Sequence, residues 1–314
     1  MNSYYNKKNP YEYKTKEFIM KRRLFIYSMA LVAFLTITSC NLFKSGDSNM
    51  PDMNFIYPLW VGNYWNYEKL TVYDFDDGAT SNGLSDTSFY SAASVEIIDR
   101  EIIFDEFYCY NFKSTLNEDG TLYVGNEYYN NTETQLIDYG YTNPYMLTPK
   151  VEKDIAYLTF KGKKFNNIQE IIHLVEKGYC NFGQTKNDSI LFDQVQCLVY
   201  PLKKGNEWSY RTETYDGEPW RIDKKILGWT RIEVPAGNFN CWRIQWFNNP
   251  FGSGTDWDED IIEFDYIAEQ GLIKRILELD NLTCYDYSGN LLGTLTYSEI
   301  LTLDEYSINN NLLL

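Results

Sequence analysis

Histidine, long apolar runs and closely paired cysteines are scarce in this 314-residue chain, and each scarcity excludes a class of protein. The one histidine, His173, leaves no second imidazole for a metal site and stands in an apolar run where a structural role is expected. No C-x-x-C spacing is present, which argues against zinc ribbons and thioredoxin-like redox chemistry. No G-x-S-x-G, Walker or H-E-x-x-H motif occurs either, so the common hydrolase and phosphate-binding sites have no support.

The longest apolar run, Leu24–Thr38, is shorter than the roughly 20 residues that a helix needs to cross a bilayer. The basic segment Met20–Arg23 precedes it, as in a secretory signal. The run ends at Ile37–Cys40, which resembles the bacterial lipobox, where the cysteine is lipidated and the peptide is cut before it. We therefore predict a lipoprotein signal peptide that starts at Met20 and lipidation at Cys40; an uncut signal anchor and a signal cut elsewhere are the alternatives.

Basic residues are also few, with 28 Lys and Arg against 44 Asp and Glu. Residues 1–39, the N-terminal extension and signal peptide, hold seven basic and two acidic residues, so the remainder carries 21 and 42, a net charge near −21. Such a surface repels the phosphates of nucleic acids and anionic lipids. We therefore expect no nucleic-acid partner, and a membrane connection only through lipid on Cys40.

Residues 40–54 are small, polar and rich in turn formers, which is typical of a flexible tether. Together with the leader, they predict an acidic domain that is lipid-anchored in the bacterial cell envelope. The sequence does not indicate which face of the membrane it occupies. The segment beyond the tether is long enough to form a full hydrophobic core without disulfides.

Five cysteines remain after Cys40, an odd number that leaves at least one thiol unpaired. We expect most of them to be buried on strands, and one bridge whose partners the sequence does not identify is possible on this count. The five are Cys109, Cys180, Cys197, Cys241 and Cys284.

An internal repeat is the strongest pattern in the mature chain. YPLWVGNYWNY (Tyr57–Tyr67) returns 143 residues later as YPLKKGNEWSY (Tyr200–Tyr210), and FYCYNF (Phe107–Phe112) aligns with FNCWRI (Phe239–Ile244). The order of the two matches predicts a duplication, with a first β unit at 55–187 and a second at 188–314. In each block Gly-Asn suits a tight turn, and Trp and Tyr two residues apart point to one side of the strand that follows.

Short runs rich in Tyr, Phe, Trp, Ile and Val, separated by turn residues, predict an antiparallel all-β fold with few helices. Its two related units would be curved sheets or half-barrels. One segment is ambiguous: residues 167–177 have apolar residues at helical spacing, with Asn167 as a possible cap and Glu170 three residues on, yet their alternation also suits a strand.

The combination of YPLKKGNEWSY, IEVPAGNFNCWRI and YIAEQGLIKRI resembles uncharacterised bacterial envelope lipoproteins of the TapB-like and DUF3108-type families. The similarity covers Tyr200–Leu279 well and the first unit only loosely, where IIFDEF stands in place of VPAG. It implies a curved, β-rich envelope domain. It implies no reaction and no catalytic residues.

Candidate sites are few. Aromatic residues could line a concave face and contact a ligand, although we expect most of them to pack in the core. Carboxylates in DWDEDIIEFD could form an oxygen cage for Ca²⁺, and DFDDG, with Asp74, Asp76 and Asp77, resembles part of an EF-hand opening. The possible ligand contacts are Trp65, Tyr67, Trp208 and Tyr210, and the weak calcium candidates are Asp256, Asp258 and Asp260.

These observations favour a non-enzymatic envelope protein that binds a ligand or partner, such as another envelope protein or a glycan. A carboxylate-based glycan hydrolase and a purely structural component are the alternatives. A buried pair of carboxylates within about 10 Å in a pocket is what the hydrolase would need.

Overall fold

The computed structural model describes residues 55–118, 121–142, 154–177, 190–215, 217–250 and 257–309. The predicted signal peptide from Met20, the lipidation site Cys40 and the tether lie outside these residues, as do Cys180 and Asp256. Residues Asn54–Leu314 form one compact unit. Within the described part of this unit, no helix has the length and apolar character that crossing a bilayer requires.

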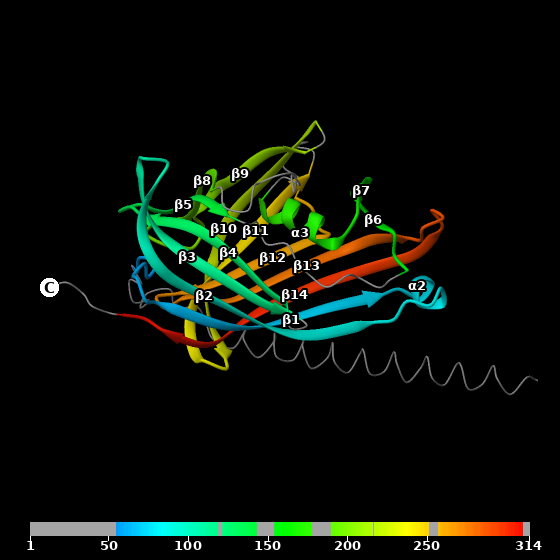
Figure 1. The fold of residues 1–314 in the computed structure, drawn as a ribbon, viewed down its shortest axis with the longest axis horizontal. Coiled ribbons are helices and arrows are strands. Elements are labelled where there is room, and N and C mark those ends of the chain that lie inside the picture. Colours follow the sequence, from blue (N-terminus) through cyan, green and yellow to red (C-terminus); the bar gives the residue numbers. More distant parts are fainter. Residues whose placement is uncertain are drawn as a thin grey trace, which may run out of the picture. The chain divides into compact units, whose positions relative to one another are not determined.

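A single antiparallel sheet of fourteen strands makes up most of the described residues and confirms the all-β prediction (Figure 1). Its twelve main strands lie in the order β8-β5-β4-β3-β2-β1-β14-β13-β12-β11-β10-β9, and the short pair β6 and β7 joins the sheet through β13. The strands are β1 (Tyr64–Phe75), β2 (Thr87–Ile103), β3 (Phe107–Glu118), β4 (Thr121–Asn131), β5 (Gln135–Thr142), β6 (Tyr157–Phe160), β7 (Lys163–Phe165), β8 (Leu191–Val199), β9 (Glu207–Tyr215), β10 (Glu218–Val234), β11 (Gly237–Pro250), β12 (Ile261–Ala268), β13 (Gly271–Tyr285) and β14 (Leu291–Ser307).

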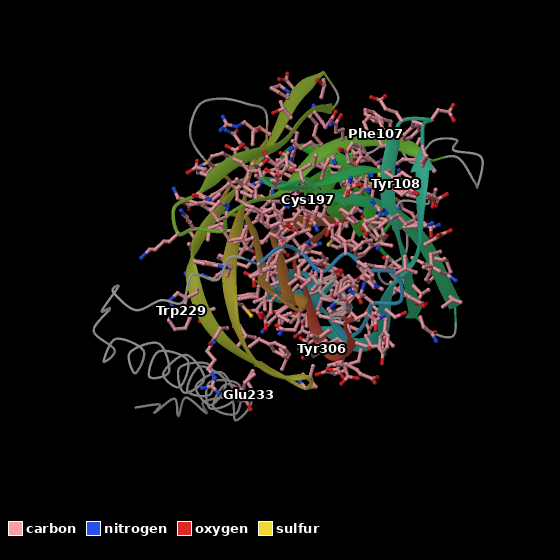
Figure 2. The ribbon with its side chains drawn as sticks, turned by 90° about the vertical axis from the view of Figure 1, so that its left-hand side faces the viewer. Phe107, Tyr108, Cys197, Trp229, Glu233 and Tyr306 are labelled. Carbon is pink, nitrogen blue, oxygen red and sulfur yellow. The ribbon has the colours of Figure 1, made fainter. Side chains whose placement is uncertain are left out.

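The sheet curves until its two edge strands, β8 and β9, lie beside each other. The indole Nε1 of Trp208 in β9 donates a hydrogen bond of 3.0 Å to the Gln196 carbonyl of β8. In Figure 2 Cys197 of β8 lies inside this curve, whereas Tyr108 and Trp229 lie on its outer surface and are exposed. The sheet is therefore nearly closed and encloses an interior.

The predicted boundary between residues 187 and 188 does not coincide with a break in the sheet. Strand β8 follows this boundary along the chain, yet it pairs with β5 from the preceding part. The central pairing, β1 with β14, joins the beginning of the sheet to its end. The division into two units stays a prediction, as does the duplication behind it.

The first repeat block forms a tight turn that is bonded to β2. Gly62 has a positive φ of 89°, which glycine adopts without a steric penalty. The Gly62 N–H donates to the Ile97 carbonyl (2.8 Å), and the Ile97 N–H donates to the Asn63 carbonyl (2.9 Å). The Asn63 side chain closes the turn by donating to the Pro58 carbonyl (2.9 Å).

The second repeat block forms a turn with the same hydrogen bonds, although its Tyr200–Pro201 peptide is cis and that of Tyr57–Pro58 is not. Gly205 has a φ of 90°, and its N–H donates to the Ile226 carbonyl (2.8 Å). The Ile226 N–H donates to the Asn206 carbonyl (2.9 Å), and the Asn206 side chain donates to the Pro201 carbonyl (3.0 Å). The repeated proline, glycine and asparagine thus make the same hydrogen bonds at both turns.

The equivalence continues into the strands that follow. The pairing of β2 with β3 shifts by one residue after Ile97, and the pairing of β10 with β11 shifts after Ile226. Four residues beyond these isoleucines, Glu101 lies opposite Cys109 and Thr230 lies opposite Cys241. The two cysteines that the sequence aligns therefore occupy the same register in their two strand pairs.

Helix α3 (Ile168–Lys177) resolves the ambiguous segment, which is a helix. The Asn167 side chain accepts a hydrogen bond from the Glu170 N–H (3.0 Å), and the Glu170 carboxylate accepts one from the Asn166 N–H (2.8 Å), as in a capping box. The apolar face of α3 packs in the main core. Its buried apolar residues are Ile168, Ile171, Leu174 and Val175. The second described helix, α2 (Asp77–Ser81), is a single short segment beside β14.

Candidate functional site: a cavity inside the curved sheet

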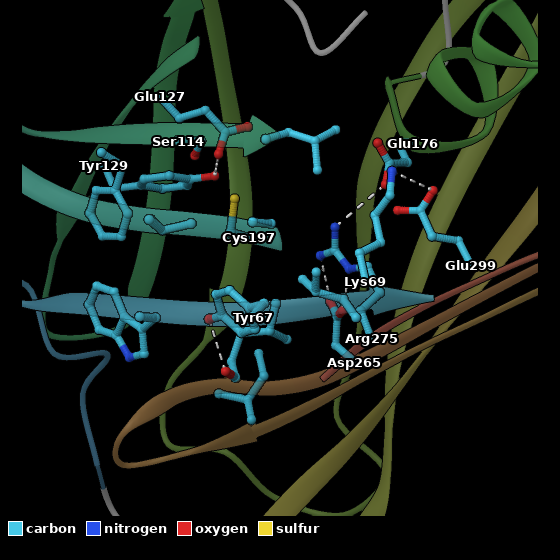
Figure 3. Close-up of a pocket in the computed structure, with 18 of the residues that line it drawn as sticks. Tyr67, Lys69, Ser114, Glu127, Tyr129, Glu176, Cys197, Asp265, Arg275 and Glu299 are labelled. Atoms are coloured by element: carbon cyan, nitrogen blue, oxygen red, sulfur yellow. Dashed lines mark hydrogen bonds and ion pairs between the residues drawn. The ribbon is translucent and has the colours of Figure 1, made fainter. Parts of the chain in front are cut away.

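A cavity of about 290 Å³ lies inside the curved sheet, beneath helix α3 (Figure 3). Each of the twelve main strands contributes at least one side chain to its wall, and α3 contributes Gln169, Ile172, Glu176 and Lys177. This volume is close to the lower end of ligand pockets, which span about 300–1,000 Å³. The spacing of the α3 residues places them on the helix face opposite to much of the apolar core face.

The alternation of strand side chains selects the residues that reach the cavity. In β1 the alternate residues Trp65, Tyr67 and Lys69 are all buried and all line the cavity. In β12 the same alternation points Asp265 and Ile267 to the interior. The strands therefore carry both aromatic and charged side chains inward.

One side of the cavity is aromatic. The rings of Trp65 and Phe112 stack with their centroids 6.1 Å apart, and Tyr129 meets Phe112 edge-on at 4.8 Å. The polar atoms of these rings are bonded: Tyr67 donates to the Leu272 carbonyl (3.0 Å), and the Tyr129 hydroxyl donates to a carboxylate (2.9 Å). With their polar atoms occupied, the rings offer their apolar surface to the cavity.

The other side of the cavity is charged (Figure 3). Arg275 binds Asp265 through Nε (2.7 Å) and Nη2 (3.2 Å), and its Nη1 lies 3.5 Å from Glu176. Lys69 lies 3.4 Å from Glu299. Burial raises the pKa of Glu176. Burial also acts to raise the pKa of Asp265, but Arg275, with smaller contributions from Lys224 and the Trp246 indole, lowers it below its usual range.

A second cation of α3, Lys177, is held by two carboxylates. Its Nζ lies 3.4 Å from Glu127 and 3.8 Å from Asp138. Asp138 is fully buried, and burial raises its pKa to about 8. Burial thus favours the neutral form of Asp138, and Glu127 is the nearer carboxyl to Lys177.

Lys224 differs from the other cavity cations. Its Nζ lies 3.5 Å from the ring centroid of Trp246 and 3.8 Å from that of Tyr210, so its contacts are cation–π interactions. Among the described residues no hydrogen bond or ion pair to this Nζ is found. Burial lowers the pKa of Lys224 to about 8.

Two further polar groups inside the sheet lack hydrogen-bond partners among the described residues. The Nε2 of Gln169 is buried at the cavity wall, and both carboxyl oxygens of Glu263 are buried in β12, two residues before Asp265. Burial raises the pKa of Glu263 well above its usual range, which favours its neutral form. The interior therefore retains unfilled hydrogen-bonding capacity.

Three of the four aromatic residues that the sequence singled out line the cavity: Trp65, Tyr67 and Tyr210. Trp208 does not, because its indole makes the hydrogen bond to β8 that links the sheet edges. That any of them contacts a ligand stays a prediction. Their position on the wall of one cavity is the observation that supports it.

The charged residues of the cavity were not singled out from the sequence, although a signal was present. In β10 the buried positions Trp220, Ile222, Lys224 and Ile226 alternate, so a lysine stands where an apolar residue is expected. In β12 Glu263 and Asp265 stand in the same way between Ile261 and Ile267. Charged residues at inward-facing positions of an alternating strand indicate a polar site in the interior.

The calcium candidates are bonded to a protein cation. The Nζ of Lys161 lies 2.7 Å from Asp258 and also pairs with Asp260, while Asp256 lies outside the described residues. Among the described residues no group of three or more metal-ligating side chains is assembled. In the other acidic segment, Asp76 caps α2 by accepting the Ala79 N–H (2.7 Å).

The four described cysteines are free thiols on strands. Cys109, Cys241 and Cys284 are buried, as expected for small apolar residues, and Cys197 lines the cavity. Burial raises the pKa of each thiol to about 12, so none is a ready nucleophile. His173 is buried in α3, and burial lowers its pKa to about 3.

No family model and no curated protein sequence matches this chain. Two solved structures are similar in part. A protein of Parabacteroides distasonis, considered a lipoprotein, is 12% identical with a TM-score of 0.35 over 82% of this chain and 100% of its own. A protein of Bacteroides fragilis, considered exported and with a YmcC-like fold, is 10% identical with a TM-score of 0.37 over 81% of this chain and 99% of its own.

Both TM-scores lie below 0.5, so neither likeness carries an argument about this chain. The resemblance to TapB-like and DUF3108-type lipoproteins stays a prediction. The leader sequence and the cavity are the features of this chain that bear on its function.

Proposed function

We propose that this chain is a lipid-anchored protein of the bacterial cell envelope that binds a small amphipathic ligand inside its curved sheet, without catalysing a reaction. The observation that carries the proposal is the divided wall of the cavity, which is aromatic on one side and charged on the other. A ligand with an apolar body beside the aromatic rings and a polar group beside the charged side chains would match both sides of the cavity.

The location in the envelope depends on the sequence alone. A basic start, a short apolar run and a lipobox-like ending at Cys40 support export and lipidation. The tether at 40–54 then connects the anchor to the compact unit that begins at Asn54. Duplication of an ancestral β unit is supported by the equivalent turns at Gly62 and Gly205, and would explain how a sheet this large arose.

Binding is favoured over catalysis by the way the carboxylates are occupied. Asp265 accepts hydrogen bonds from Arg275 on both oxygens and from the Trp246 Nε1 on Oδ2 (2.8 Å). A carboxylate with both oxygens engaged is a poor nucleophile or base. The charged side therefore resembles a fixed wall more than a reactive centre.

A glycan hydrolase remains the second candidate because of one specific observation. Glu176 and Asp265 line the same cavity, are both bonded to Arg275, and have pKa values shifted in opposite directions. Such a divergence is the pattern of an acid and an ionised partner in glycosidases. Hydrolysis of a glycan by the wild type that Glu176→Gln abolishes would support this candidate over simple binding.

The binding proposal is tested by filling the cavity. Ala93 lines the cavity, whereas Ala92, its neighbour in β2, is exposed on the outer face. 1-Anilinonaphthalene-8-sulfonate, an aromatic anion, is titrated into the full-length protein and its fluorescence is measured. Wild type and Ala92→Phe should bind one probe with equal affinity, and Ala93→Phe should bind it at least about tenfold more weakly, since the added ring occupies the space. Equal binding by all three would contradict the proposal.

A further inference from the structure

The four cations on the cavity wall differ in what neutralises them. Three form ion pairs with carboxylates of the same wall: Lys69 with Glu299, Lys177 with Glu127, and Arg275 with Asp265. The fourth, Lys224, contacts the rings of Trp246 and Tyr210 and forms no ion pair among the described residues, while the nearby carboxylate of Asp265 is bound by Arg275. The side chain of Lys224 is nonetheless almost completely buried, with 4% exposure.

A buried ammonium without a counter-ion is costly, because it has lost the water that solvated it. Contacts with ring faces offset only part of this desolvation penalty. An anion placed in the cavity would repay more of it, and it would accept hydrogen bonds from a group that has donors to spare. Lys224 is therefore the point of the wall where an incoming anion gains most.

We infer that Lys224 binds the single carboxylate of an organic acid whose apolar body lies against the aromatic side of the cavity. The inference rests on the proposed binding function and specifies its ligand class. The uncharged Nε2 of Gln169, also on the wall and without a partner among the described residues, adds a second donor to the interior.

The charged side chains of the cavity wall favour a ligand with one negative charge over a ligand with two. The other three cations are already paired, and the fourth carboxyl of the wall, Glu176, is also bound to Arg275, so Lys224 is the one wall cation without an ion pair among the described residues. Glu127 and Glu299 also face the cavity and would repel a dianion such as a phosphate monoester. A monocarboxylate with an alkyl or aromatic body fits this balance.

The test compares decanoate with decan-1-ol, which share an alkyl chain and differ in the anionic group. Binding to the full-length protein is measured by isothermal titration calorimetry for wild type, Lys224→Met and Lys225→Met. Lys225 is the matched control because it follows Lys224 in β10 but points outward, where its Nζ pairs with Glu207 (2.8 Å). Decanoate should bind Lys224→Met about 10- to 100-fold more weakly than wild type or Lys225→Met.

Decanol should bind all three proteins alike, which also shows that the variants are folded. If Lys224→Met binds decanoate as tightly as wild type, the inference is overturned while binding by the cavity stands. If wild type binds neither compound, the inference and the proposed function both fail.

A measurement on wild type alone covers the case in which the variant does not fold. Decanoate affinity should fall by about tenfold per pH unit above pH 8, where Lys224 loses its proton, and decanol affinity should stay constant. A decanoate affinity that is constant from pH 7 to pH 10 would overturn the inference. The groups that face Lys224 from the surrounding strands are Cys197, Tyr210, Glu263, Asp265 and Arg275. Burial raises the pKa of Glu263 well above its usual range, and its deprotonation would act with the same sign, since it adds negative charge near Lys224.

Discussion

Arg275 binds both carboxylate oxygens of Asp265, at 2.7 Å and 3.2 Å, on the wall of the cavity. The carboxylate is almost fully buried, with 3% exposure, and the indole of Trp246 donates a third hydrogen bond to it (2.8 Å). The same guanidinium reaches Glu176 of α3 at 3.5 Å. Arg275 thus connects three adjoining parts of the fold: β13, β12 and the helix above the cavity.

Removing this arginine should destabilise the protein strongly. Arg275→Met leaves Asp265 buried without its counter-ion, and breaking a buried pair in this way costs about 3–5 kcal/mol. The free energy of unfolding, measured with urea, should fall by about 3 kcal/mol because part of the guanidinium is accessible. Arg231→Met, at an exposed position of β10, is the control and should change it by less than about 0.5 kcal/mol.

The double variant separates lost charge from lost packing. Adding Asp265→Asn to Arg275→Met removes the orphaned charge and should restore part of the lost stability. If the double variant is less stable than Arg275→Met alone, the unpaired Asp265 carboxylate was not the cause of the lost stability. The ion pair between Arg275 and Asp265 would then not stabilise the fold as described.

Gly271 should tolerate no side chain because it lies against the aromatic wall. A Cβ on Gly271 would lie 2.9 Å from the Trp65 Nε1 and 3.3 Å from the Tyr57 hydroxyl. Gly83, with φ near +95° against +109° at Gly271, has open space around its Cβ position. Both alanine variants incur the left-handed backbone cost of about 1–2 kcal/mol. Gly271→Ala should incur a further 1–3 kcal/mol or so of overpacking.

Urea unfolding of the two variants measures the difference directly. Equal losses of unfolding free energy in Gly271→Ala and Gly83→Ala would mean that the aromatic side of the cavity can shift. Trp65 would then be held less firmly than its contacts indicate. A shift of tryptophan emission in Gly271→Ala alone would locate the change at the cavity wall.

The single histidine gives a clean pH prediction. Burial lowers the pKa of His173 to about 3, well below its value of about 6.5 in an unfolded chain. Between these values the unfolded chain binds more protons than the folded protein, so this group lowers stability as pH falls from 6.5 toward 3. The one imidazole Cε1–H signal in the proton NMR spectrum should stay constant from pH 8 to about pH 4.5. Titration of that signal near pH 6.5 in the folded protein would contradict its burial in α3.

Lipidation is tested at the predicted anchor. Radiolabelled palmitate should enter the wild-type protein in the bacterium, and Cys40→Ser should prevent its incorporation and release the protein from the membrane fraction. Cys109→Ser is the control, because that thiol is buried in β3. Full-length wild-type protein in the cytosol without label would contradict export and anchoring together.

Local features of the fold could be predicted from the sequence because neighbouring residues determine them. The turns at Gly62 and Gly205 follow from a glycine and an asparagine that can close them, and both are found with the same hydrogen bonds. The segment from Ile168 was ambiguous in periodicity alone. Its capping residues, Asn167 and Glu170, were the decisive signal, and they make the bonds that the helix requires.

The cavity could not be predicted in the same way, because it depends on pairings between distant residues. Strand β1 lies beside β14, with Lys69 opposite Leu301 in the strand register. Strands β8 and β9 meet only when the sheet has curved fully. An inward aromatic residue such as Tyr67 meets either another side chain or an open space, and the sequence does not distinguish them. Lys224 and Asp265 were the available hint, since charged residues at inward positions require partners inside.

The central claim is that the curved sheet holds a ligand, and native mass spectrometry of the protein extracted from bacterial membranes tests it most directly. Wild type and Ala92→Phe should carry an added non-covalent mass that organic extraction releases as an amphipathic acid. Ala93→Phe should lack that mass. An identical spectrum for all three proteins, with no added mass beyond that of the lipid predicted on Cys40, would contradict the account.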